Sequence, residues 1–290
     1  MKIEIWPKFG PLNSHKIFDC FIQSLRNNGE QLFVNENANA DVAVIWSVLW
    51  QGRMRNYQRI WQQYRSLGKP VVVLEVGGLR RNESFKIGIN GVNAKADFAN
   101  ETFDDKRWPL FKHSLKPWKD TGNKIIILGQ HHTSEQWAGM PAMNRWFENQ
   151  ITEIRKHTDR HIELRPHPRN SIIFDVKKFK NVSIRYPVMD RTTIDDTDFK
   201  NVLQDAYAVV NYSSNPAMEA VINGVPVFVS EDSLCHEVGN TTFDNINNPT
   251  KPDRQNWAYK LSYTEWFADE IAEGKPWKRI KKRLEEKYLK

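Results

Sequence analysis

Short apolar runs, rich in β-branched residues, recur along this chain and alternate with segments of helical periodicity. The clearest runs are Val42 to Trp46, Val71 to Leu74, Lys124 to Leu128 and Ala206 to Asn211. Each run is continuous rather than alternating with polar residues, which is typical of strands buried on both faces of a parallel sheet. Such strands need crossover helices between them, so the pattern predicts a doubly wound α/β fold.

The alternation occurs twice, and an irregular stretch separates the two series. The first series begins with a strand at Lys2 to Trp6 and a helix at Ser14 to Asn27. Glycines and prolines interrupt the pattern between Phe85 and Trp118, which predicts an edge hairpin and an interdomain linker. The second series runs from Lys124 to Val229. Two series of this kind predict two Rossmann-like domains that face each other across a cleft.

The composition fits a folded protein with a moderate excess of positive charge. Of the 290 residues 40% are hydrophobic, and 42 Lys and Arg against 35 Asp and Glu leave a formal net charge of +7. This charge suits a phosphate-bearing ligand or a polyanionic partner. The two cysteines, Cys20 and Cys235, are far apart, and neither suggests a disulfide framework or a zinc site. No apolar run approaches the roughly 18 residues of a membrane span, so we expect a cytoplasmic protein without a transmembrane segment.

A small polar turn between a strand and a helix is the strongest local motif. Ser213, Ser214 and Asn215 follow the strand at Ala206 to Asn211, and Pro216 begins the next helix. Hydroxyls and free backbone N–H groups at a helix start favour an anion such as a phosphate. Glu219 follows about one turn later, within reach of a ribose attached to that phosphate. The alternative is simple helix capping by Ser214 or Asn215.

A second motif, Arg165-Pro166-His167-Pro168-Arg169, directly follows the strand at Ile162 to Leu164. The two prolines hold His167 in an extended turn between two guanidinium groups. His167 could donate a hydrogen bond to a phosphate or to a leaving oxygen, with added charge from Arg165 or Arg169. The alternative is a solvated basic turn. Both motifs follow strands of one parallel sheet, so they are expected to meet at one edge.

These motifs resemble those of nucleotide-sugar glycosyltransferases of the GT-B fold, in particular bacterial sialyltransferase-like and capsule-polysaccharide transferase-like enzymes. His167-Pro168 matches a His-Pro motif, and Ser213-Ser214 matches a Ser-Ser motif. The run from Glu219-Ala220 to Gly224-Val225-Pro226 looks like the Glu-Ala and Gly-x-Pro segment of the wider superfamily. The resemblance covers about residues 124–230.

The resemblance implies an acceptor-binding domain at residues 1–118 and a donor-binding domain at residues 119–262. The final segments, which read as helical at 257–263, 264–273 and 276–290, would return to the first domain from about residue 263. The expected donor is a UDP- or CMP-sugar, with no bound cofactor and no metal. Asp195-Asp196 is read as a turn and cap rather than a metal-binding pair.

The resemblance also assigns residues to the donor. His167 and the two serines would hold the nucleotide phosphates, Glu219 the ribose, and Gln130 and His131 lie in a loop often kept near those phosphates. An ordinary mobile loop is the alternative for the last two. The expected donor-binding residues are Arg165, His167, Arg169, Ser213, Ser214, Asn215, Glu219, Gln130 and His131.

Inversion at the sugar requires a carboxylate to take a proton from the acceptor hydroxyl. The family's acidic pair before glycine is not cleanly present. The nearest candidate is Glu75, followed by Val76-Gly77-Gly78 at the end of the third strand. Glu75 and His167 are therefore the expected catalytic residues. Glu75 could instead pair with Arg80 or Arg81, and a retaining enzyme would need no such base.

Residues near the strand ends of the first domain are candidates for the acceptor site. We expect Trp50 to offer an exposed ring for stacking on a sugar or base. Ser14 is equally a helix cap. The expected acceptor-binding residues are Ser14, His15, Trp50, Arg53, Gly77 and Arg80.

Two acceptor classes remain open. A hydroxymethylpyrimidine in phage DNA is favoured by the net charge and by the first domain's arginines, and it implies the host cytoplasm as location. These arginines are Arg53, Arg55, Arg59, Arg65, Arg80 and Arg81. A bacterial surface polysaccharide is favoured by the motif resemblance, with the basic residues of 275–283 as a peripheral membrane contact. A non-catalytic nucleic-acid-binding protein and a sugar-nucleotide epimerase are the further alternatives.

Overall fold

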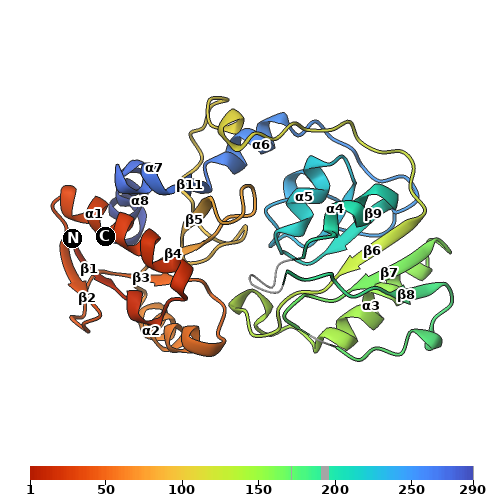
Figure 1. Ribbon diagram of the computed structural model, residues 1–290, viewed down its shortest axis with the longest axis horizontal. Coiled ribbons are helices and arrows are strands. Elements are labelled where there is room, and N and C mark those ends of the chain that lie inside the picture. The colour runs from red at the N-terminus through yellow and green to blue at the C-terminus, as the bar shows by residue number, and fades with distance from the viewer. Residues whose placement is uncertain (171, 191–195, 290) are drawn as a thin grey trace. The chain divides into compact units, whose positions relative to one another are not determined.

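The computed structural model describes residues 1–170, 172–190 and 196–289, and the chain divides into two units (Figure 1). Unit 1 consists of Met1–Lys112 together with Ala258–Lys290, and unit 2 is His113–Trp257. The chain therefore leaves unit 1, forms unit 2 and then returns. The sequence interpretation puts the two divisions at 118/119 and 262/263, a few residues later in each case.

Unit 1 is built on a sheet with the strand order β11-β5-β4-β3-β1-β2. β1 to β4 pair in parallel, β5 is antiparallel to β4, and β11 is antiparallel to β5. The strands are β1 Lys2–Ile5, β2 Gln31–Val34, β3 Val42–Trp46, β4 Val71–Val76, β5 Ser84–Ile89 and β11 Glu265–Phe267. The helices are α1 His15–Asn27, α2 Arg55–Ser66, α7 Ala268–Ala272 and α8 Lys275–Arg283, and α6 Gln255–Ser262 enters this unit from unit 2.

Apolar residues explain why unit 1 closes around this sheet. Every residue of β3 is buried, as the continuous run of β-branched side chains predicts. On α1, Phe18 packs against Trp46 of β3, and Phe21 packs edge-on against Trp277 of α8. The C-terminal segment is thus part of the core of unit 1.

Unit 2 is built on a parallel sheet with the strand order β10-β9-β6-β7-β8. The strands are β6 Lys124–Leu128, β7 His161–Arg165, β8 Val182–Ile184, β9 Ala206–Asn211 and β10 Val227–Val229. The helices are α3 Met143–Arg155, α4 Phe199–Val202 and α5 Pro216–Ile222. β6 lies between β9 and β7, so the segments that follow these three strands emerge side by side at one edge.

Two strands of unit 1 differ from the sequence expectations. β2 is unanticipated, because this edge strand is only partly buried and carries a weak apolar pattern. Residues 264–273, expected to be helical, instead form β11 and the short α7. Pairing with β5 overrides the local preference, because Glu265 is fully buried and its carboxylate accepts hydrogen bonds from Ser84 and from the N–H groups of Gly78 and Leu79. β5 is consequently an inner strand rather than an edge.

A buried ion pair holds the returning segment in place. Arg107 pairs with Glu270 of α7, and its guanidinium lies 3.9 Å from the centre of the Trp266 ring. Arg107 also donates to the backbone carbonyls of Ser262 and Glu265. Breaking the pair would leave one buried charge without its counter-charge, which is strongly destabilising. The pair therefore holds α7 and β11 against the loop that contains Arg107.

Candidate functional site

The segments after β6 and β9 are joined by hydrogen bonds between Gln130 and Ser213. The backbone N–H of Ser213 donates to the Gln130 side-chain oxygen over 3.2 Å, and the Gln130 amide donates to the Ser213 hydroxyl over 3.2 Å. Both residues are buried. Beside them, the Asn211 amide donates to the Ser214 hydroxyl over 2.7 Å. The loops after β6 and β9 therefore meet at one edge of the sheet.

The segment after β7 reaches the same edge. The N–H of Gly129 donates to the carbonyl of Arg165 over 2.9 Å, and the Asn170 amide donates to the carbonyl of Gln130 over 3.2 Å. The rings of His131 and His167 lie 5.2 Å apart in an edge-to-face arrangement. Gln130, His131, His167, Ser213 and their neighbours therefore form one group, which we call the strand-end cluster; its members are Gln130, His131, His167, Arg169, Asn170, Ser213 and Ser214.

His131 is the most perturbed titratable group of this cluster. Burial, followed by the positive charges of His132 and Arg169, lowers the pKa of His131 to about 4. Its Nδ1 atom accepts a hydrogen bond from the N–H of Thr133 over 3.3 Å. Its Nε2 atom is buried and has no hydrogen-bond partner among the residues that the structure describes. The imidazole is therefore neutral at physiological pH.

Arg165 lies elsewhere than the sequence interpretation assumes. Its side chain is buried, and its guanidinium pairs with the carboxylates of Asp196 and Asp198. Because Nε and Nη2 of Arg165 bind these carboxylates, Arg165 supports the loop. Its Nη1 atom is buried and has no hydrogen-bond partner among the described residues, so a role toward a phosphate stays a prediction. Asp198 stands at the start of α4 without capping it, and Asp195 lies outside the described residues. Arg169, at the other end of the turn, is exposed.

Asn215 follows Ser214 directly, and Glu219 lies on α5, the helix that begins at the next residue, Pro216. Asn215 precedes the helix and makes no side-chain capping bond to it. Burial raises the pKa of the Glu219 carboxyl, partly offset by the charge of Lys200. A half-buried carboxylate with a raised pKa suits a hydrogen-bonding role toward a ligand hydroxyl.

In unit 1, Glu75 of β4 is paired with a residue that the sequence does not single out. The hydroxyl of Ser47, directly after β3, donates to the Glu75 carboxylate over 2.5 Å. Ser47 is buried and has a φ of 61°, a left-handed conformation that is rare for residues other than glycine. Glu75 is half-buried and does not pair with Arg80, which instead binds Glu83.

The remaining acceptor candidates are dispersed in unit 1. Trp50 is only 7% exposed and packs against Trp61, so the expectation of an exposed stacking ring is wrong. Ser14 is buried, and its hydroxyl donates to the carbonyl of Pro11 rather than capping α1. His15 and Arg53 are exposed. A Cβ at Gly77 would collide with Glu265 and Ser84, so close packing accounts for this glycine.

The surface arginines and the basic tail differ in how they are neutralised. Arg53, Arg55 and Arg59 are exposed at the start of α2, a helix without acidic residues. Within the described part of the chain, no ion pair joins them to a carboxylate. Four residues separate Arg55 from Arg59, and both lie at the helix end that disfavours cations. Most basic residues of α8 have partners within unit 1. Arg279 donates to backbone carbonyls. Four others form ion pairs: Lys275 with Glu273, Lys281 with Glu30, Lys282 with Glu286, and Arg283 with Asp97 and Glu101.

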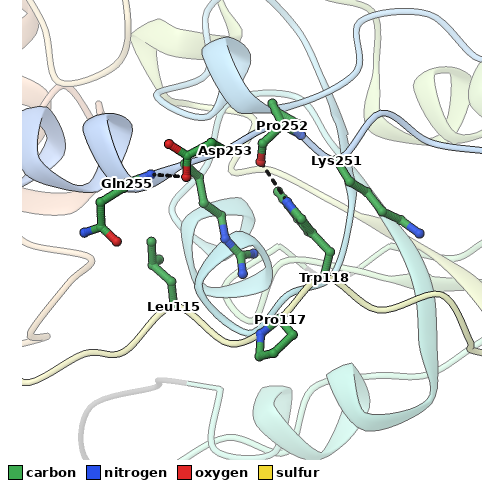
Figure 2. Close-up of a pocket in the computed structure, with 8 residues that line it drawn as sticks. Leu115, Pro117, Trp118, Lys251, Pro252, Asp253 and Gln255 are labelled. Atoms are coloured by element: carbon green, nitrogen blue, oxygen red, sulfur yellow. Dashed lines mark hydrogen bonds between the residues drawn. The ribbon is translucent and has the colours of Figure 1, made fainter.

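Figure 2 shows a pocket of about 300 Å³ in unit 2 that includes no residue of the strand-end cluster. It is lined by Leu115, Pro117, Trp118 and residues 251–255. The Trp118 indole donates to the carbonyl of Pro252 over 2.8 Å, and the Arg254 guanidinium lies 4.0 Å from the centre of its ring. Gly224 has a φ of 79°, and a Cβ there would strike the carbonyl of Pro117. The pocket thus lies where two passages of the chain pack together near the start of β10, away from the strand ends that carry the cluster.

The described residues contain neither a membrane-spanning helix nor a cluster of metal ligands. None of the helices in these ranges is both long and apolar enough to cross a bilayer. Within the same ranges, no group of three or more His, Cys, Asp or Glu side chains is arranged to hold a metal ion.

Comparison with solved structures identifies the fold. No protein-family model matches the sequence, and no curated protein matches it. The KpsC β-Kdo 2,4 transferase of Thermosulfurimonas dismutans is similar with a TM-score of 0.52 and 11% identity, over 91% of this chain and 90% of that one. The KpsC β-Kdo 2,7 transferase of the same organism gives a TM-score of 0.52 and 14% identity, over 96% and 100%. The chain therefore has the α/β fold of these two proteins, with two Rossmann-like units of the GT-B type.

The sequence patterns did not single out two residues near the candidate sites, Asn170 and Ser47. Asn170 connects the loops after β6 and β7, because its side chain also bonds His132 over 2.8 Å. Asn170 directly follows Arg169 of the Pro-rich turn, and this position could have marked it as a candidate. Ser47 follows the apolar run of β3, and a polar residue at such a strand end was a comparable signal.

Proposed function

We propose that this protein is a glycosyltransferase that moves a sugar from a UDP- or CMP-sugar to a hydroxyl acceptor. The observation that carries the proposal is the strand-end cluster, in which buried Gln130 and Ser213 bond each other and His131 meets His167. Hydroxyl, imidazole and guanidinium donors gather there at the carboxyl ends of parallel strands, where α/β folds bind ligands. The fold shared with two transferases supports the same conclusion.

In this proposal, the donor phosphates accept hydrogen bonds from Ser213, Ser214 and His167, and Arg169 adds positive charge. The bond between the anomeric carbon and the phosphate oxygen breaks, and its electron pair stays on the phosphate. These donors stabilise the developing negative charge. Glu219 holds the ribose hydroxyls. If the configuration inverts, the acceptor proton passes to the Glu75 carboxylate as the acceptor oxygen bonds to the anomeric carbon.

Donor binding is tested by calorimetry with UDP and CMP and by thermal shifts with their sugar derivatives. His167→Ala and Ser214→Ala should each weaken nucleotide affinity by about 10-fold or more, because each removes a hydrogen bond to a charged group. His161→Ala and Ser183→Ala are the matched controls. These two residues form a hydrogen bond with each other and belong to neither motif. Wild-type affinity in both site variants would remove the donor-site assignment.

For the acceptor, we propose a 5-hydroxymethylpyrimidine in DNA. Arg53, Arg55 and Arg59 support this choice, because they are exposed and form no ion pair with any carboxylate of the described residues. Like charges at the start of a helix cost stability, and a phosphate backbone would relieve that cost. The basic tail gives less support to a membrane contact, because most of its side chains are engaged within unit 1.

The DNA acceptor is tested with duplexes that differ only in the hydroxymethyl group. Transfer of labelled sugar to the modified duplex alone is expected. Arg55→Gln/Arg59→Gln should reduce the slope of log K against log salt by about two. Lys278→Gln/Lys282→Gln is the control, because it removes two charges at the same spacing from the exposed face of α8. An equal salt slope in both double variants would refute the role of the α2 arginines in DNA binding.

A bacterial surface glycan is the second candidate acceptor. It is favoured by the fold shared with two enzymes described as β-Kdo transferases. Transfer of sugar to an oligosaccharide, with none to modified DNA, would establish it. Salt-sensitive DNA binding without binding of any nucleotide would instead indicate a non-catalytic DNA-binding protein.

A further inference from the structure

His131 and His167 are held by the same local hydrogen bond. In each case Nδ1 accepts the backbone N–H of the residue two positions later: Thr133 N–H over 3.3 Å for His131, and Arg169 N–H over 3.1 Å for His167. A backbone N–H can only donate, so the accepting Nδ1 carries no proton. The ring proton of each imidazole is therefore on Nε2. The two turns present a pair of Nε2–H donors from neighbouring loops.

The Nε2–H of His131 has an unmet hydrogen bond. The residue is 5% exposed, and its Nε2 atom is buried without a partner in the described part of the chain. A buried donor that lacks an acceptor loses its hydration without recovering it, so folded proteins rarely keep one unless it has another use. Since Thr133 already occupies Nδ1, the missing partner must be an acceptor of hydrogen bonds at Nε2.

The surroundings of His131 indicate the charge of that partner. His132 stacks on its ring at 5.5 Å between centroids, and His167 lies on another side at 5.2 Å. Among the described residues, His132 and Arg169 are the groups whose charge lowers the pKa of His131, and no carboxylate there acts on it. Donors and positive charge without a carboxylate favour an anionic oxygen over a neutral carbonyl.

We infer that the Nε2–H of His131 donates a hydrogen bond to a phosphoryl oxygen of the nucleotide-sugar donor, beside His167. The inference rests on the proposed function and gives one member of the strand-end cluster, His131, a specific role as a neutral hydrogen-bond donor. Burial keeps the ring neutral, so it orients the phosphate through its Nε2–H without adding a positive charge. Arg169 contributes positive charge, and the Nε2–H of His131 fixes the orientation of the phosphoryl oxygen.

Nitrogen-15 NMR of the unmodified protein tests the tautomer and the contact together. The long-range imidazole correlations should identify His131 as the Nε2–H form, with His131→Gln used for assignment. Saturating UDP or CMP should shift the Nε2 resonance and leave Nδ1 nearly unchanged. A protonated Nδ1, or an Nε2 resonance unmoved by a nucleotide that binds, would overturn the inference.

Affinity measurements supply the second test. His131→Phe should weaken UDP or CMP binding by roughly 10- to 100-fold, and His131→Gln should recover part of the loss because its amide can still donate. His132→Gln is the matched control and should stay within about 2-fold of wild type, a change well below one hydrogen bond. Circular dichroism checks that each variant is folded.

The outcomes separate the two proposals. Nucleotide binding that His131→Phe leaves unchanged would refute the role of His131 and leave the transferase proposal standing. A wild-type protein that binds neither UDP nor CMP would refute the transferase proposal, and this inference with it. If His131→Phe fails to fold, the NMR measurement on the wild type still decides.

Discussion

The stability of unit 2 should fall in mild acid because of His131. Burial and nearby positive charge lower the pKa of this imidazole to about 4, whereas an unfolded chain leaves a histidine near its ordinary value of about 6.5. Below the ordinary value the unfolded state takes up a proton that the folded state does not, so stability decreases as the pH falls. The loss begins near the ordinary pKa and is complete once the pH passes below the folded one.

The two pKa values give the size of this effect. Between about pH 7.5 and about pH 5, the linkage relation predicts a loss of about 2 kcal/mol from His131 alone. For a domain of this size, that corresponds to a decrease of about 4–8 °C in Tm.

Urea unfolding of the wild type and of His131→Gln at the two pH values measures the difference. Other titrating groups contribute to both proteins and largely cancel in the comparison. The variant should lose about 2 kcal/mol less than the wild type on acidification. Parallel pH profiles for the two proteins would refute the reasoning about this buried imidazole.

Three further predictions concern stability in urea or thermal unfolding. Ser47→Gly should be more stable than Ser47→Ala by about 1 kcal/mol, because both lose the hydroxyl but only glycine tolerates the left-handed conformation without strain; the opposite order would contradict the strain. Glu270→Gln should destabilise unit 1 by about 3–5 kcal/mol, because it leaves the buried Arg107 without its counter-charge, and an unchanged unfolding midpoint would show that the pair contributes little. Gly224→Ala should cost more than Gly139→Ala, since both have positive φ but only Gly224 faces a backbone carbonyl at the Cβ position; equal costs would show that the neighbouring chain yields easily.

The central strands could be predicted from sequence because burial on both faces leaves a continuous apolar run. The structure confirms Val42–Trp46, Lys124–Leu128 and Ala206–Asn211 with the expected bounds. Edge pairing carries no such signal, so β2 and β11 were not foreseen. β11 in particular depends on contacts between Glu265 and loop N–H groups that are 186 and 187 residues away in sequence.

The candidate site was predictable in position but not in its bonds. That the loops after β6, β7 and β9 meet follows from the parallel sheet. The pairing of Gln130 with Ser213 and of Arg165 with Asp196 depends on side-chain directions that no local pattern records. Arg165 illustrates this limit, because its place at the start of the Pro-rich turn suggested a ligand cation, while a distant segment supplies the carboxylates that pair with it.

The discontinuity of unit 1 has a consequence for synthesis of the chain. Unit 2 is one continuous stretch, whereas unit 1 lacks β11, α7 and α8 until residues 258–289 leave the ribosome. Until then β5 has one unpaired edge, and the apolar surface that Trp277 covers is exposed. The later unit can therefore complete its fold first, while the earlier one waits as a partly open sheet that is prone to aggregation. A nascent chain released before residue 258 would contain a finished unit 2 and an unfinished unit 1.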